Sequence, residues 1–382
     1  MSENNNFSDD LFDDIDTVPG TRSPKNTFLP WHHPRKQLVR KEQWVHYIKQ
    51  NIQIMLGDRT TLSYFSLPGD DLLDIRVLHD QVCEPNNLEL KFIGFNDHTE
   101  DSGRAQNANL SLAEVKAMNK VSAESKYFSN NILQAGSQNS LAYMRVKDNG
   151  DYDVVNLDFC DSIMSSAPQA DENHYNLLFQ LLTIQRSRDK PWLLFLTTRI
   201  GREHVQADTL NLLLDCYKEN LENEVFNECS SRAYGISNEI ELESNLRNAS
   251  TFSKILCTSF CKWLLKNALS FTPKNTIKVL DAMEYTVHSE AQHPDMISIA
   301  LLFKPRLDLL QDGSGLARTS RSTEILSEPV ISSRFLNRFS STTNCDNYLG
   351  TDESKRTEIF NESVELMKSA RFDTTNYIDS FF

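Results

Sequence analysis

The chain has 382 residues and a formal net charge of −14, with 39% hydrophobic and 24% charged residues, as in an ordinary soluble protein that can bury a core. We find no apolar run long enough to span a bilayer, and the N-terminus lacks the basic and apolar segments of a signal peptide. The seven cysteines show neither a zinc-binding spacing nor a disulfide framework, so we expect reduced thiols, no metal site and a cytoplasmic protein. The acidic balance argues against broad non-specific nucleic-acid binding but leaves room for a local basic patch.

The first part of the chain changes character at about residue 28. Residues 1–27 are polar and acidic, which predicts a disordered arm. The next segment is basic and leads into a helix on which Trp44, Ile48 and Ile52 recur at helical spacing. Its basic residues either contact a nucleic-acid backbone or another anionic ligand, or stay solvated while the aromatic face packs on the domain; they are Arg35, Lys36, Arg40 and Lys41.

The middle of the chain alternates strand-like and helix-like segments. Runs of β-branched, aromatic or continuous apolar residues predict strands at 60–67, 88–97, 154–159 and 191–198, and a further strand is expected within 128–150. Residues 277–287 and 296–303 predict an antiparallel pair of strands. We therefore expect an α/β domain over residues 28–305, with a mostly parallel sheet, an antiparallel terminal pair and helices on both faces. Residues 306–382 are expected to form a C-terminal extension with one helix, whose aromatic tail docks on the domain or on a partner.

Polar and glycine residues follow three of the predicted parallel strands. Because the carboxyl ends of parallel strands meet at one edge of a sheet, these residues are expected to converge on a ligand site. The first strand ends in Ser66, Pro68 and Gly69, the second in Asn96 and Asp97, and the fourth in Asn156, Asp158 and Phe159. Alternatively, Gly69 serves only the turn, Asp97 is a polar loop residue, Asp158 caps the following helix and Phe159 belongs to the core.

On these segments the chain resembles the Rossmann-like, class I S-adenosylmethionine-dependent methyltransferases. Phe65-Ser-Leu-Pro-Gly69 is similar to the family's first cofactor motif, Phe95-Asn-Asp97 to its acidic second motif, and Asn156-Leu-Asp-Phe159 to its fourth. The resemblance covers about residues 40–305 and rests mainly on the order of elements. It implies a parallel sheet closed by an antiparallel terminal strand.

The fourth motif is similar to two different signatures. Asn156-x-x-Phe159 has the spacing of the amino-methyltransferase motif, in which an amide or acid accepts from the target amine and an aromatic ring stacks on a flipped base. Asn156-Leu-Asp158 resembles the Asp-Leu-Asp signature of tRNA-guanine methyltransferase-like proteins and of partner proteins named for a three-cysteine motif. In those proteins, the acid after the strand helps to hold the cofactor or the acceptor.

The resemblance implies a methyltransferase that uses S-adenosylmethionine and acts on nucleic acid. Gly69, with Ser66 and Pro68, would approach the amino-acid end of the cofactor, Asn96 or Asp97 would hold its ribose, and Phe95 or Phe159 would flank the adenine or the acceptor. Asn156 and Asp158 would orient an amine.

The alternative function is a methyltransferase-like scaffold or partner subunit with reduced catalysis. The single glycine of the first motif, the acidic arm and the aromatic tail favour this alternative. A dinucleotide-dependent dehydrogenase, a serine hydrolase or zinc protease, and a P-loop phosphotransferase are disfavoured because their sequence motifs are absent.

Overall fold

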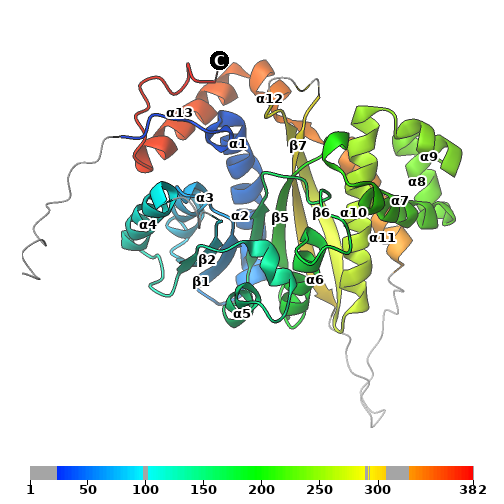
Figure 1. Ribbon diagram of the computed structural model, residues 1–382, viewed down its shortest axis with the longest axis horizontal. Helices are drawn as coiled ribbons and strands as arrows, with labels where there is room; N and C mark the ends of the chain where they lie inside the picture. Colours follow the sequence, from blue (N-terminus) through cyan, green and yellow to red (C-terminus); the bar gives the residue numbers. More distant parts are fainter. Residues whose placement is uncertain (1–23, 98–101, 289–290, 292, 307–326, 382) are drawn as a thin grey trace, which may run out of the picture.

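The computed structural model describes residues 24–97, 102–288, 291, 293–306 and 327–381. These residues form an eight-stranded sheet with helices on both faces (Figure 1). The strand order is β3-β2-β1-β4-β5-β7-β6-β8. The strands are β1 (Thr61–Ser66), β2 (Glu89–Phe95), β3 (Lys126–Phe128), β4 (Val154–Asp158), β5 (Trp192–Arg199), β6 (Lys274–Tyr285), β7 (Met296–Arg306) and β8 (Thr343–Asn344).

Strand β7 is antiparallel to both of its neighbours, and the remaining pairs of adjacent strands are parallel. The predicted α/β class, the mostly parallel sheet and the antiparallel pair formed by β6 and β7 are therefore confirmed. The short β3 lies at one edge of the sheet, and only its last residue, Phe128, falls within the region 128–150 in which a further strand was expected. Three residues are too few to give a periodic signal in the sequence.

Both faces of the sheet are covered because successive side chains of the inner strands alternate between two apolar layers. Phe65 and Val155 contact one layer, and Tyr64 and Val154 contact the other. The first layer contains η4 (Ile132–Gly136), α5 (Leu141–Asp148), α6 (His174–Gln185) and α10 (Ala249–Ser270). The second contains α1 (Pro34–Val39), the π-helical η2 (Arg40–Val45), α2 (His46–Leu56), α3 (Leu73–Leu78), the π-helical η3 (His79–Cys83), α4 (Ser102–Ala117), α12 (Cys345–Thr351) and α13 (Glu353–Ser369).

A helical insertion follows β5 and η5 (Arg202–His204) and lies at the side of the sheet beside α10 (Figure 1). It has its own apolar cluster, which includes Tyr217, Phe226 and Leu242. Leu336 from the C-terminal part of the chain joins this cluster. The insertion consists of α7 (Ala207–Leu221), α8 (Glu224–Tyr234) and α9 (Glu239–Asn245), and Leu336 belongs to α11 (Glu328–Ser340).

The C-terminal extension differs from the expectation of one helix, because its described part holds α11, α12 and α13. α11 and α12 were missed because they are rich in Ser, Thr and Asn, and their stability comes from tertiary packing, of α11 on α8, α10 and β6 and of α12 on α1, α13 and β6. The predicted arm at residues 1–27 lies mostly outside the described residues. Among the residues that the structure describes, every helix is too short or too polar to span a membrane.

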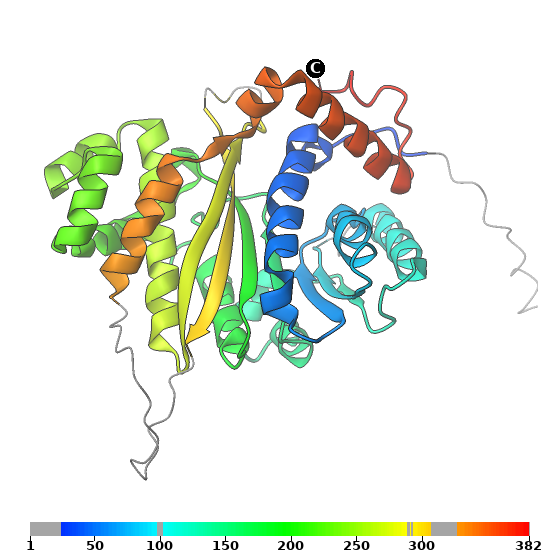
Figure 2. The same cartoon turned by 180° about the vertical axis from the view of Figure 1, so that it is seen from behind.

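The aromatic tail packs back onto the N-terminal segment of the same chain. Tyr377 is fully buried and donates a hydrogen bond to the backbone oxygen of His32. Phe28 stacks on Phe372 with ring centroids 5.4 Å apart and meets Tyr377 edge-on. The two ends of the described chain therefore close over the same part of the domain (Figure 2).

We predict that Tyr377→Ala lowers the free energy of unfolding by about 3 to 5 kcal/mol, because it empties a buried aromatic site and leaves the His32 carbonyl without its donor. Urea unfolding followed by circular dichroism measures this change. Ile378→Ala is the matched control, because the Ile378 side chain is 43% exposed and its truncation should cost under about 0.5 kcal/mol. Equal effects of the two substitutions would contradict the role of the tail.

Candidate active site

A cleft opens where the connections of the sheet reverse direction. From β1 the chain moves outward through β2 and β3, and then crosses to β4 on the other side of β1. In open α/β sheets, ligands bind at such a point, outside the carboxyl ends of the strands. Here a cavity of about 550 Å³ is lined by residues that follow β1, β2, β3 and β4, together with residues of the N-terminal helices.

The loop after β1 forms the floor of the cleft at Pro68 and Gly69. Gly69 has φ +64°, and a Cβ atom there would meet nothing within 4 Å, so its backbone is open to the cavity. Gly94 of β2 allows this loop to approach, because a Cβ at that position would lie 3.0 Å from Pro68. The structure thus places two of the predicted cofactor-binding residues, Pro68 and Gly69, in the cleft.

Asn96 and Asp97 line the same cavity at the end of β2, as predicted. The Asn96 amide donates to Asp70 Oδ1 at 2.5 Å, and Arg104 of α4 pairs with the same carboxylate at 2.8 Å. Asp97 is exposed at the cavity wall. An acid at this position presents carboxylate oxygens to a pair of vicinal hydroxyls, which is the geometry a ribose requires.

Asp158 lies at the end of β4 and accepts a hydrogen bond from the buried ammonium of Lys36 at 2.5 Å. Lys36 Nζ also lies 3.3 Å from the Tyr285 hydroxyl and 4.8 Å from the centre of the Trp44 ring. Burial lowers the pKa of Lys36, and the charge of Asp158 offsets part of that effect. The acid predicted to be catalytic is therefore held by a lysine from α1.

Arg40 is the second cation from the N-terminal helices that lines the cleft, and its side chain is only 4% exposed. One guanidinium nitrogen donates to the backbone oxygen of Trp31 at 3.0 Å. Its Nε–H has no acceptor among the described residues. A buried N–H without an acceptor costs free energy, so an anionic or carbonyl group of a ligand in the cleft would stabilise this site.

Asn156 and Ser66 lie beneath the cleft, where the sequence had predicted that they line it. Both are fully buried and face each other across β1 and β4. The Asn156 amide donates to the Tyr64 hydroxyl at 2.8 Å, and Ser66 and Tyr64 both donate to Asp74 of α3. Burial raises the pKa of Asp74. These residues form a polar network under α3, in which Asp74 borders the cavity while Asn156 and Ser66 are not part of its lining.

Phe159 lines the cleft, and its side chain belongs to the apolar layer on the face of the sheet opposite to Asn156. It is 9% exposed and meets the His174 ring edge-on at 4.7 Å. Asn156 is in the middle of β4, so a residue three positions later points to the other face of the sheet. The amide and the ring therefore do not form one amino-methyltransferase-like pair, whereas Asp158 and Phe159 both reach the cavity.

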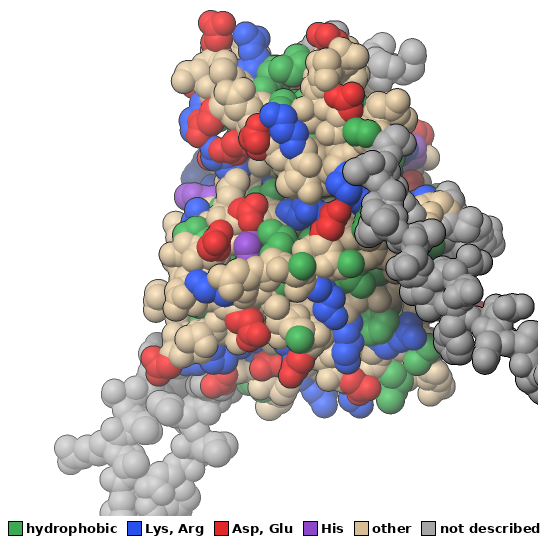
Figure 3. All heavy atoms as spheres, turned by 90° about the vertical axis from the view of Figure 1, so that its left-hand side faces the viewer, with side chains coloured by type: hydrophobic (Ala, Val, Ile, Leu, Met, Phe, Trp, Pro, Cys, Tyr) green, Lys and Arg blue, Asp and Glu red, His purple; other side chains and the backbone are tan. Residues whose placement is uncertain are grey.

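The four basic residues near the N-terminus do not form one solvent-facing cluster. Lys36 and Arg40 are buried in the cleft. Arg35 pairs with Asp346 and donates to the Thr286 backbone oxygen at 2.8 Å. Lys41 pairs with Glu358 and Glu362 of α13. On the face that includes α3 and α4, acidic and basic side chains are interspersed (Figure 3).

Lys36 and Arg40 were expected from the sequence as possible contacts with an anionic ligand, but their burial in the cleft was not predicted, although the sequence carries a signal for it. The apolar stripe Trp44, Ile48 and Ile52, continued backward in steps of four residues, reaches both cations and places them on the packed face. Other residues of the cleft that were not predicted come from distant segments, and no local pattern marks them; they include Trp31, His174, Arg199 and Tyr285.

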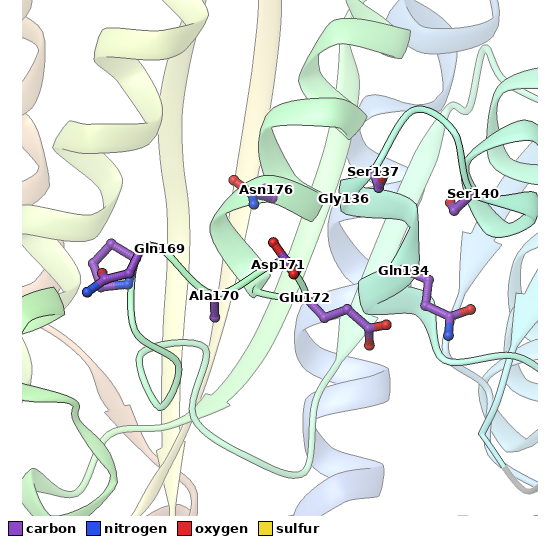
Figure 4. Close-up of a pocket in the computed structure, with 10 residues that line it drawn as sticks. Gln134, Gly136, Ser137, Ser140, Gln169, Ala170, Asp171, Glu172 and Asn176 are labelled. Carbon is purple, nitrogen blue, oxygen red and sulfur yellow. The ribbon is translucent and has the colours of Figure 1, made fainter.

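A second, more open hollow of about 690 Å³ lies between η4 and the loop that leads into α6 (Figure 4). Gln169 and Ala170 lie on one side of it and Gln134 and Ser140 on the other, with Glu172 between them. Its lining contains two acids, Asp171 and Glu172, and no lysine or arginine. Because residues at the ends of β1, β2 and β4 line the cleft, and the described lining of the hollow contains none of them, we take the cleft as the candidate site.

The model of one protein family, described as PP_RS20740-like, matches residues 25–382. No curated protein matches the chain.

We predict that His174 makes the protein less stable in acid. Burial lowers the pKa of His174 from 6.5 to about 4, so the folded state excludes a proton that the unfolded chain binds. This stabilising contribution is complete above about pH 6.5 and is lost as the pH falls toward 4, a difference of about 3 kcal/mol. Urea unfolding between pH 7 and pH 4 should show a correspondingly smaller loss of stability for His174→Leu than for the wild type. Identical pH profiles would contradict the prediction.

Proposed function

Since the chain belongs to the PP_RS20740-like family, whose description states no reaction, we propose from its cleft that it is an S-adenosylmethionine-dependent methyltransferase. The observation that carries the proposal is the position of the cleft. It lies at the carboxyl ends of β1, β2 and β4, in a mostly parallel sheet in which the antiparallel β7 lies between β5 and β6. This is the arrangement that the resemblance to class I methyltransferases implies.

The residues in the cleft suit the three parts of such a cofactor. Gly69 offers exposed backbone to the amino-acid end, and the unpartnered Nε–H of Arg40 suits its carboxylate. Asp97 suits the ribose hydroxyls at the end of β2. Ile132 and Leu133, which follow β3, provide apolar wall for a flat base. Both signs of charge are present in the cleft, as a zwitterionic ligand requires.

Bound S-adenosylmethionine would supply a methyl group on a sulfonium, which passes in line to the acceptor's lone pair while the carbon–sulfur electrons return to sulfur. Such a displacement depends mainly on alignment of the acceptor. Asp158 is the group placed to accept a hydrogen bond, and then the proton, from an acceptor amine or hydroxyl. Lys36 fixes the position of that carboxylate at 2.5 Å, and Phe159 forms the apolar wall beside it. Asp158 and Phe159 are therefore the proposed contacts with the acceptor, and Lys36 is a positioning residue.

We retain a nucleic acid as the proposed acceptor, with Asp158 beside the reacting group and Phe159 beside its ring. Lys36 and Arg40 do not contribute phosphate contacts to this proposal, because both are buried in the cleft. A cytoplasmic location is part of the same proposal, and the seven free cysteines are compatible with it.

We predict micromolar binding of S-adenosylmethionine by calorimetry, weakened at least tenfold by Asp97→Ala because the ribose loses its acceptor. Asp58→Ala is the matched control, since Asp58 is an exposed acid next to the opposite end of β1. No binding by folded wild-type protein would refute the cofactor proposal and favour the scaffold function that the single-glycine motif suggests. Equal loss in both variants would refute the role of Asp97.

We predict that Asp158→Asn lowers the methyl-transfer rate about 100-fold or more and changes the dissociation constant of the cofactor less than threefold, because the amide cannot take a proton. Incorporation of radiolabelled methyl groups into tRNA, DNA and protein measures the rate. Asp161→Asn, an exposed acid three residues later in the same loop, should retain most of the activity. If Asp158→Asn retains full activity, the acid does not act on the acceptor.

A further inference from the structure

A groove of about 540 Å³ lies between α11, the first half of β6 and the last residues of β7. β7 is antiparallel to both β5 and β6, so β6 runs in the same direction as β5. β8 also runs in this direction. The first residues of β6 are therefore at the end of the sheet opposite to the cleft. α11 runs alongside β6 (Figure 2). The proposed methyltransferase site makes no use of this groove.

Among the residues that the structure describes, the lining of the groove contains basic side chains and no acid, although the chain as a whole carries a net charge of −14. Its cations are Lys278, Lys304, Arg306, Arg334 and Arg338. Four of them, Lys278, Lys304, Arg334 and Arg338, are exposed and form no ion pair with any described residue. Asp281 is an acid close enough to interact with Arg338. Burial raises the pKa of Asp281, and the positive charge of Arg338 offsets part of that rise.

The strand register brings the cations of β6 and β7 to one face. Lys274 is directly opposite Arg306, and Thr276 is directly opposite Lys304. Lys278 follows Thr276 by two residues and therefore projects from the same face. Lys278 and Lys304, which are both exposed, therefore add their positive charges on one side of the sheet.

α11 supplies the other wall of the groove. Arg334 and Arg338 are one helical turn apart and lie on the same side of the helix as Asn337 and Ser341. The floor residues Ile277, Val279 and Phe335 are 3%, 4% and 1% exposed. Apart from the partly covered Val330 and Ile331, the groove thus offers charge and hydrogen-bond donors, with little apolar surface for an incoming side chain.

We propose that this groove binds the phosphate backbone of single-stranded nucleic acid. A backbone presents a regular series of anions, which matches cations that the strand register places roughly 5 to 8 Å apart. An acidic protein segment would need apolar anchors that the nearly covered floor cannot receive. The lining holds no exposed aromatic side chain, so bases are not stacked there and binding is independent of sequence. This inference does not depend on methyl transfer, because it concerns a separate surface.

The test is fluorescence anisotropy of a labelled 20-nucleotide oligo(U) with the full chain, measured without cofactor over a range of salt concentrations. The double variant Lys278→Glu/Arg334→Glu should weaken binding at least tenfold and make the slope of log K against log salt shallower by about 1.4, because two phosphate contacts are lost. The matched control is Lys116→Glu/Lys49→Glu, which makes the same charge change at exposed positions on α4 and α2. Thermal melting establishes that both variants are folded.

Three outcomes would overturn the proposal. The first is no binding by the wild type at low salt, and the second is equal weakening of binding by the two double variants, which would indicate a general charge effect. Equally strong competition by polyglutamate at matched charge would assign the groove to acidic proteins instead. Because the cofactor is absent from the assay, failure here leaves the calorimetric test of the cleft unaffected.

Discussion

A buried ammonium in the cleft constrains the elements around it, because Lys36 keeps its charge only while its partners stay in place. Removing a charge from water costs several kcal/mol, and a nearby opposite charge with good geometry must offset that cost. Asp158 of β4 supplies the charge, and Tyr285 of β6 and Thr197 of β5 supply further oxygens within 3.4 Å. α1 and three strands therefore meet at one atom. Moving β4 would leave the ammonium without its counter-charge, and moving β5 or β6 would remove one of its neutral oxygen partners.

A second buried charge, the carboxylate of Asp71, holds together the segments that surround the same cleft. Asp71, in the loop after β1, contacts Lys25, His32 and Asn107, which come from the N-terminal segment and α4. Burial alone would raise the pKa of Asp71, but the hydrogen bonds from His32 and the charge of Lys25 hold it well below its ordinary value. The carboxylate therefore stays ionised. With Tyr377 bound to the His32 backbone, it ties both ends of the described chain to the loop that carries Gly69.

The two ends of the sheet differ in how their charges are balanced. In the cleft, Lys36 and Asp71 are paired with opposite charges, and the unsatisfied donor is the Nε–H of Arg40. Such a site recognises a small ligand by a few directed hydrogen bonds. At the other end, Lys278 and Arg334 face solvent in a groove without acids. A surface of this kind attracts a polyanion over a distance set by the ionic strength, and it adds affinity without selecting a base sequence.

The sequence by itself determined the α/β class, the antiparallel pair β6 and β7, and the positions of Gly69, Asp97 and Asp158 at strand ends. These features depend on local patterns: apolar runs mark strands, and polar residues mark the places where strands stop. The roles of Asn156 and Ser66 needed the tertiary structure, because the length of β4 and the helix packed above it decide which polar side chains are covered.

The cations were divided between the cleft, the surface and the groove by tertiary contacts alone. Lys36 and Lys41 are five residues apart in one basic segment, yet one is buried against Asp158 and the other pairs with α13. The basic groove combines β6, β7 and α11, which are separated in sequence by residues outside the described part of the chain. A sequence lists charges in chain order, whereas the free energy of a charge depends on its burial and on the groups that the fold brings within a few ångströms.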